Sequence, residues 1–184
     1  MQTRVQVFTF RDGLLARLAH DLQITVGRFE LALDHGRVHG WFDPTSLQVD
    51  GAVRDQRLQP AALSADDKRK IHENLTREVL ETARYPRIEV EGRLEAITHG
   101  YLVAGQLHMH GQSRALSVPV RFDAEGAVAE VELTPSLFGI APYKALGGAI
   151  RLQDRVVVRL TVLAAKETLE AAAASPEPTV FGLG

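Results

Sequence analysis

Residues 155–162 read RVVVRLTV, the clearest secondary-structure signal in this chain. Val156, Val158, Leu160 and Val162 occupy every second position, so their side chains point to one face of an extended strand. β-Branched residues dominate this stretch, as is typical of strands. The same two-residue period returns along most of the sequence, which predicts a mainly β protein.

Six stretches earlier in the chain share this alternation of apolar with polar or small residues. Their apolar positions are Val5 and Val7; Leu22, Ile24 and Val26; Ile88, Val90 and Leu94; Val103, Leu107 and Met109; Leu116, Val118, Val120 and Phe122; and Val128, Val131 and Leu133. Turn residues at Asp34-His35-Gly36, Thr98-His99-Gly100 and Glu125-Gly126 favour short antiparallel connections. We therefore predict roughly eight antiparallel strands in a lipocalin-like barrel, because closure removes exposed sheet edges.

One segment has helical spacing instead. Ser64 and Asp67 have the spacing of a capping box, and Ile71, Leu75 and Val79 then form a single apolar stripe. The pattern predicts one α-helix from about residue 64 to residue 83, which ends before Pro86 and packs across the barrel.

The chain is expected to form one domain over residues 1–165. The remaining residues, 166–184, include the Ala-rich run 171–174 and the Pro-containing run 175–178, so we predict a partly disordered tail with a frayed helix. The 184 residues have a formal net charge of −2, which makes nucleic acid an unlikely partner, and they contain no cysteine for disulfides or thiolate sites. We expect no membrane span and, without a signal peptide, a cytoplasmic location.

The stretch GQLHMHGQSRAL, residues 105–116, resembles a hairpin of the YceI-like family. The resemblance continues with His20 before Val26-Gly27-Arg28-Phe29, with Tyr85-Pro86, and with Phe138-Gly139-Ile140 ahead of Leu152, Asp154 and Val156. It covers about Val5 to Leu163. The chain departs from the family pattern at Glu78-Val79-Leu80-Glu81 and lacks an Arg shortly before Phe138.

This resemblance implies a barrel that encloses a long apolar lipid, polyisoprenoid or quinone-like, in a family that often forms homodimers and is often secreted. We accordingly expect non-enzymatic binding of such a lipid for storage or transport, with no other cofactor. The residues expected to contact the ligand are His20, Phe29, Phe42, Tyr85, Tyr101, Met109, Phe138 and Ile140. Tyr85 and Tyr101 offer hydroxyl groups to a headgroup.

Histidines leave alternatives open. His20 is either a hydrogen-bonded core residue, a ligand contact or, in a lipid-modifying enzyme, a general base. His108 and His110 alternate with Leu107 and Met109, so we expect both to face solvent, and no metal site is predicted.

Besides lipid binding and lipid modification, a third possible function is protein–protein interaction by a ligand-free barrel that is filled by its own side chains.

Overall fold

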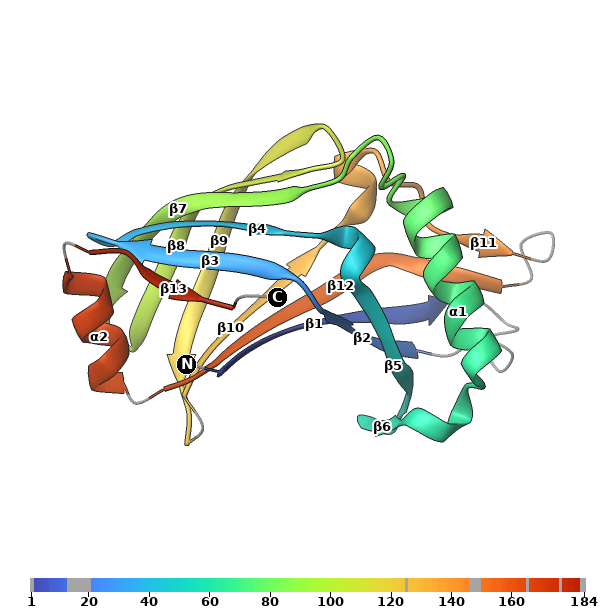
Figure 1. The fold of residues 1–184 in the computed structure, drawn as a ribbon, viewed down its shortest axis with the longest axis horizontal. Coiled ribbons are helices and arrows are strands. Elements are labelled where there is room, and N and C mark those ends of the chain that lie inside the picture. Colours follow the sequence, from blue (N-terminus) through green and yellow to red (C-terminus); the bar gives the residue numbers. More distant parts are fainter. Residues whose placement is uncertain are drawn as a thin grey trace.

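The structure is a computed structural model that describes residues 2–12, 21–124, 126–145, 150–164, 166–175 and 177–182. A single antiparallel sheet curls along the long axis of the molecule, with one α-helix at each end (Figure 1). The mainly β, antiparallel class predicted from the sequence is confirmed.

The first half of the sheet runs up to helix α1. Its strands and helix are β1 (Gln2–Asp12), β2 (Asp21–Val26), β3 (Phe29–Asp34), β4 (Arg37–Phe42), β5 (Leu47–Arg54), β6 (Arg57–Gln59) and α1 (Ala65–Asn74). The second half contains β7 (Ile88–Ile97), β8 (Gly100–Met109), β9 (Gln112–Phe122), β10 (Ala127–Leu133), β11 (Lys144–Ala145), β12 (Ile150–Leu163), α2 (Lys166–Ala174) and β13 (Thr179–Phe181).

Twelve of these strands form one hydrogen-bonded path, in the order β13-β3-β4-β7-β8-β9-β10-β12-β1-β2-β5-β6, and β11 pairs beside β12. The first strand pairs with the last long one, from Gln2 opposite Leu163 to Asp12 opposite Arg151. Only residues 27 and 28 separate β2 from β3, and only residues 43–46 separate β4 from β5. The chain therefore passes twice through one bend between the β3–β4 pair and the β2–β5 pair, which lie near opposite ends of the path, and the sheet curls around its apolar interior.

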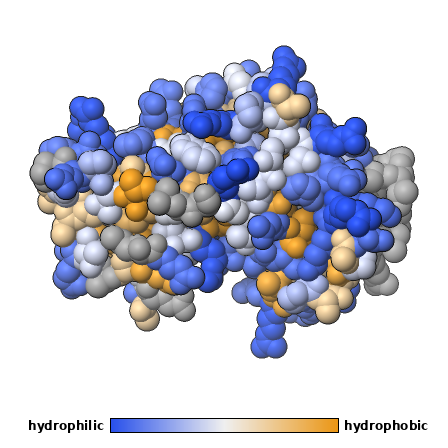
Figure 2. Space-filling view, viewed as in Figure 1, coloured by the Kyte–Doolittle hydropathy of each residue, from blue (hydrophilic) through white to orange (hydrophobic). Residues whose placement is uncertain are grey.

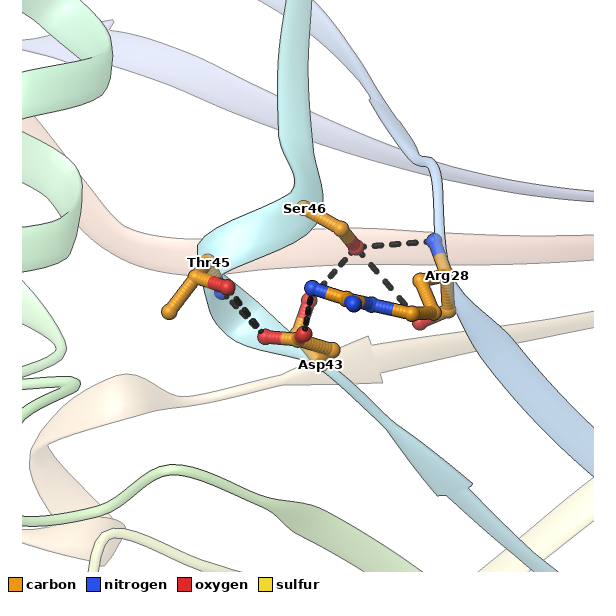
Figure 3. A network of polar contacts seen from close by, with 4 residues as sticks. All are labelled: Arg28, Asp43, Thr45 and Ser46. Atoms are coloured by element: carbon orange, nitrogen blue, oxygen red, sulfur yellow. Dashed lines mark hydrogen bonds and ion pairs between the residues drawn. The ribbon is translucent and has the colours of Figure 1, made fainter. Parts of the chain in front are cut away.

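Four side chains hold this bend together (Figure 3). The Asp43 carboxylate pairs with the Arg28 guanidinium at 2.6 Å and accepts hydrogen bonds from the Thr45 backbone N–H at 2.7 Å and hydroxyl at 2.6 Å. The Ser46 hydroxyl accepts from the Arg28 N–H at 2.8 Å and donates to the Asp43 carbonyl at 2.7 Å. Gly27 is required there, because a Cβ would lie 2.9 Å from the Ser46 carbonyl oxygen.

The Asp43 carboxyl has a lowered pKa. Partial burial raises the pKa, but the hydrogen bonds from Thr45 and the charge of Arg28 outweigh that effect. Asp43 is therefore an anion near neutral pH, and it links the β4 end of the bend to the β3 side.

Three fold expectations need correction. The sheet is a curled half-barrel rather than a closed barrel, because β13 and β6 end its hydrogen-bonded path and do not pair with each other among the described residues. The described residues form thirteen strands rather than eight, because the bend divides two long strands and because the short β6, β11 and β13 depend on pairing with distant segments. They also form two regular α-helices rather than one, since α2 occupies the segment for which only a frayed helix was expected.

Helix α1 itself begins as predicted, since Ser64 and Asp67 make a reciprocal capping box. It is shorter than expected: after Asn74 it continues only as a π-helical turn, Leu75–Val79, and Glu81 then adopts a positive φ of 44°. The chain thus turns several residues before Pro86.

The segment after residue 165, expected to be a partly disordered tail, packs on the sheet over its described residues. β13 pairs with β3, and Leu169 and Phe181 are buried in the main core cluster. Helix α2 covers the end of the sheet opposite α1 (Figure 1).

Candidate functional site

A large apolar cavity runs inside the curled sheet. Its volume is about 780 Å³, which is within the usual range for small-molecule sites. The inward positions of the alternating strands supply most of its wall, including Val5, Val7, Ile24, Leu31, Val90, Leu107, Val118, Val158, Leu160 and Val162. The two-residue period that predicted the strands thus also makes the wall apolar.

The cavity is open and polar at the α1 end. Lys70 and Asn74 of α1 contribute to its wall there, as do Tyr143 and Gln153 from segments beside α1. We call these four residues the mouth. Lys70 is exposed, and the Asn74 amide donates a hydrogen bond to the Tyr143 hydroxyl at 2.8 Å. Figure 2 shows hydrophobic residues reaching the surface in the region of α1 and β5, amid a mostly hydrophilic face.

Three contacts with the rest of the chain fix α1 over this end. The His72 ring nitrogen Nδ1 lies 2.8 Å from the Leu47 carbonyl oxygen, and the Lys68 ammonium donates to the Asp50 carbonyl at 2.8 Å. The Asn74–Tyr143 bond is the third. α1 is thereby held at the side of β5 and leaves Lys70 at the rim.

At the α2 end, by contrast, the wall is buried. Leu169 and Phe181 contribute to the wall and are 9% and 3% exposed. Tyr101 is the polar residue of this end, and its hydroxyl donates to Glu170 at 3.2 Å. Burial, and then the hydrogen bond and charge of Glu170, raise the pKa of Tyr101, so the hydroxyl stays protonated.

One buried polar atom faces the lining between these ends. The Thr9 side chain is part of the cavity wall, and its hydroxyl oxygen is buried with no hydrogen-bond partner among the described residues. The cavity therefore presents an apolar wall with polar groups concentrated toward the mouth. Such a wall suits a molecule with one polar end and a long apolar body.

The structure places four of the eight expected ligand residues in the cavity wall: Phe42, Tyr101, Met109 and Ile140. Phe29, Tyr85 and Phe138 are not part of that wall. Phe29 stacks on Phe42 at a centroid distance of 6.0 Å, in a second core cluster. Tyr85 packs on His110 at 4.1 Å, and Phe138 is buried in the main core cluster. His20 lies outside the described residues.

The expected exposure of His108 and His110 is half right. His108 is exposed, but the His110 side chain is only 9% exposed. His110 lies in the β8–β9 turn with a positive φ of 52°, which takes its ring off the alternating strand faces. The ring lies against Tyr85, 3.2 Å from the Phe138 carbonyl oxygen. Among the described residues, no three His, Asp or Glu side chains cluster as a metal site would require.

The sequence did not predict several residues of the cavity wall. These residues belong to segments that meet only in the folded chain. They are Lys70, Asn74, Tyr143 and Gln153 at the mouth, and Leu169 and Phe181 at the far end. For Lys70 and Asn74 a signal did exist, since they flank Ile71 on the predicted helix. For Phe181 there was none, because its strand forms only by pairing with β3.

The curled antiparallel sheet and the apolar cavity inside it define the class of β half-barrel folds. A model of the YceI-like domain matches residues 20–164, and the chain therefore belongs to the YceI-like family. The resemblance found in the sequence is confirmed. No curated protein sequence matches this chain.

Two solved structures share the fold. BcnA from Burkholderia cenocepacia is 12% identical in sequence, with a TM-score of 0.63 over 89% of this chain and 96% of that one. A polyisoprenoid-binding domain from Saccharophagus degradans, implicated in plant cell wall breakdown, is 10% identical, with a TM-score of 0.54 over 86% of this chain and 90% of that one. No helix in the described part of the chain is long and apolar enough to cross a membrane.

Proposed function

We propose that this protein binds one amphiphilic lipid, a polyisoprenoid or quinone-like molecule, with its tail in the cavity and its headgroup at the mouth. The observation that carries the proposal is the polarity of the cavity along its axis: Lys70, Asn74 and their neighbours line the open end, while the rest of the wall is mostly aliphatic and aromatic, with few polar side chains such as Thr9, Asp43 and Tyr101. The polyisoprenoid-binding domain with the same fold supports this choice of ligand class.

The energetics favour a long tail. Burying about twenty carbons at ~0.8 kcal/mol each contributes roughly 16 kcal/mol, against an association cost of about 4–15 kcal/mol. A short tail does not offset that cost. A wholly polar ligand would find few hydrogen-bond partners along the wall, because most of the hydrogen-bonding side chains lie near one end of the cavity.

Storage or transport of the lipid, rather than its chemical conversion, is the role we propose. Lys70 and the Asn74–Tyr143 pair lie at the rim, where they contact a headgroup without needing to reach along the tail. The enzymatic alternative requires His20 as a base, and a turnover assay on His20→Ala tests it. A side-chain-filled interaction barrel is disfavoured by the cavity of about 780 Å³. A homodimer and a cytoplasmic location stay predictions from the sequence.

The direct test is organic extraction of natively purified protein, followed by mass spectrometry. We expect one apolar compound in a near-equimolar amount, and none from an unrelated protein purified in the same way. Empty extracts, combined with no binding to a panel of polyprenols and quinones, would contradict the proposed function.

A further inference from the structure

The C-terminal segment lies beyond the family domain yet completes the cavity. The family match ends at residue 164, whereas α2 begins at Lys166 and β13 ends at Phe181. β13 pairs antiparallel with β3, with Thr179 opposite Leu33 and Phe181 opposite Leu31. We call α2 and β13 together the C-terminal plug, because they close the end of the sheet opposite α1 (Figure 1).

The plug contributes two side chains to the cavity wall itself. Leu169 and Phe181 line the cavity beside Leu31 and Leu33 and are 9% and 3% exposed. At the mouth, Lys70 is exposed. A tail that enters at the mouth therefore ends against the plug.

Polar contacts hold the plug in place. The Tyr101 hydroxyl donates to Glu170 of α2 at 3.2 Å, and the His35 N–H donates to the Ser175 carbonyl at 3.3 Å. After Phe181, the backbone of Gly182 lies so close to the Phe29 ring that a Cβ there would be 2.1 Å from it. Phe29, which is not part of the wall, thus supports the last strand of the plug from behind.

We propose that Leu169 and Phe181 set the longest lipid tail that this protein accepts. The inference rests on the proposed function. Each methylene that enters the cavity raises affinity about fourfold, as long as it is buried. Once the tail reaches the plug, a longer tail must either displace two buried side chains or leave apolar carbons in water at the mouth.

The test incubates the 184-residue protein with an equimolar mixture of polyprenols of graded length in detergent micelles. Native mass spectrometry then identifies the chain lengths of the bound polyprenols. We expect wild type to show an upper length, and the Leu169→Ala/Phe181→Ala protein to accept tails about one isoprene unit longer, because an engineered cavity of about 150 Å³ holds a benzene-sized group. Ala127→Val adds bulk to the same end and should shorten the upper length.

Leu75→Ala is the matched control, since it removes the same atoms as Leu169→Ala but from the wall near the mouth. It should leave the upper length unchanged. Circular dichroism checks each fold, and if the double variant does not fold, Leu169→Ala alone and Ala127→Val carry the test. An unchanged upper length in the folded plug variants would overturn the inference, and so would an equal shift in Leu75→Ala. Failure of wild type to bind any polyprenol would instead overturn the proposed function.

Discussion

Single residues decide how the sheet turns. At the bend, the Asp43 carboxylate joins the Arg28 guanidinium and both donors of Thr45, and its side chain is only 16% exposed. These contacts hold Phe42, which precedes Asp43, and Pro44, which follows it, in the cavity wall. One charged side chain thereby connects the stability of the bend to the shape of the binding cavity.

Replacing Asp43 by Ala should lower the free energy of unfolding by about 1–2 kcal/mol near neutral pH, since it removes the ion pair and the acceptor for Thr45. The folded-state pKa of Asp43 is below its ordinary value of 3.8, so this stabilisation is complete above that value and is lost as the pH falls through the lowered pKa. Urea titrations at several pH values measure the difference, which should shrink in acid.

Glu89→Ala is the control for that experiment, because it removes an exposed carboxylate on β7. A pH-independent difference between Asp43→Ala and wild type would show that the carboxylate's charge does not stabilise the bend.

Among the elements, α1 is distinguished by its position beside the mouth. Its N-terminus is fixed by the Ser64 hydroxyl, which accepts from the Asp67 N–H at 3.1 Å, while Asp67 accepts from the Ser64 N–H at 3.1 Å. The Ser64 hydroxyl also donates to the Asp67 carboxylate at 2.6 Å, and this bond, followed by the bond from the Ser64 N–H, lowers the pKa of Asp67. Since Lys70 and Asn74 lie on the following turns, the cap sets where the rim residues sit.

Ser64→Ala should therefore destabilise the start of α1, at a cost of about 1 kcal/mol in the free energy of unfolding. Hydrogen exchange should become faster in the α1 amides and stay unchanged in β8 and β9. Ser117→Ala makes the same chemical change at an exposed position on β9 and serves as the control. Equal exchange in α1 of the two variants would contradict a capping role.

Sequence patterns predicted the elements well where local chemistry determines them. The capping box of α1 and the Asp34-His35-Gly36 turn, with positive φ at His35 and Gly36, are examples. Alternation on β8 correctly turned Met109 inward. Aromatic character did not predict the wall, because Phe29 and Phe138 are buried outside it, and no local pattern revealed that β13 pairs with β3.

At the scale of the whole molecule, the two ends of the cavity differ in polarity and exposure. Exposed Lys70 lies at one end, buried Leu169 and Phe181 lie at the other, and aliphatic side chains from nearly every long strand lie between them. In the proposed binding mode, the headgroup of the lipid lies near α1 and the end of its tail near α2. A charge added to the aliphatic part of the wall should then oppose binding.

Met109→Glu should abolish lipid retention, since a carboxylate in the wall stays charged at a desolvation cost or takes up a proton. His108→Glu is the matched control: it adds the same group at the neighbouring position of β8, where the side chain is exposed, and should retain lipid. Extraction and mass spectrometry measure the bound lipid in variants that circular dichroism shows to be folded. Retention by folded Met109→Glu together with loss in His20→Ala would favour the histidine-centred enzyme.

The pairing of β1 with β12 has a consequence for biosynthesis. Gln2 pairs with Leu163, so β1 lacks this partner until the long intervening stretch of chain has been synthesised. At about 5–20 residues per second, this delay is on the order of ten seconds. Pairing of β1 with β12, and after it the docking of α2 and β13, must therefore wait until these later segments have been synthesised, and until then the nascent protein exposes the apolar surface that later lines the cavity.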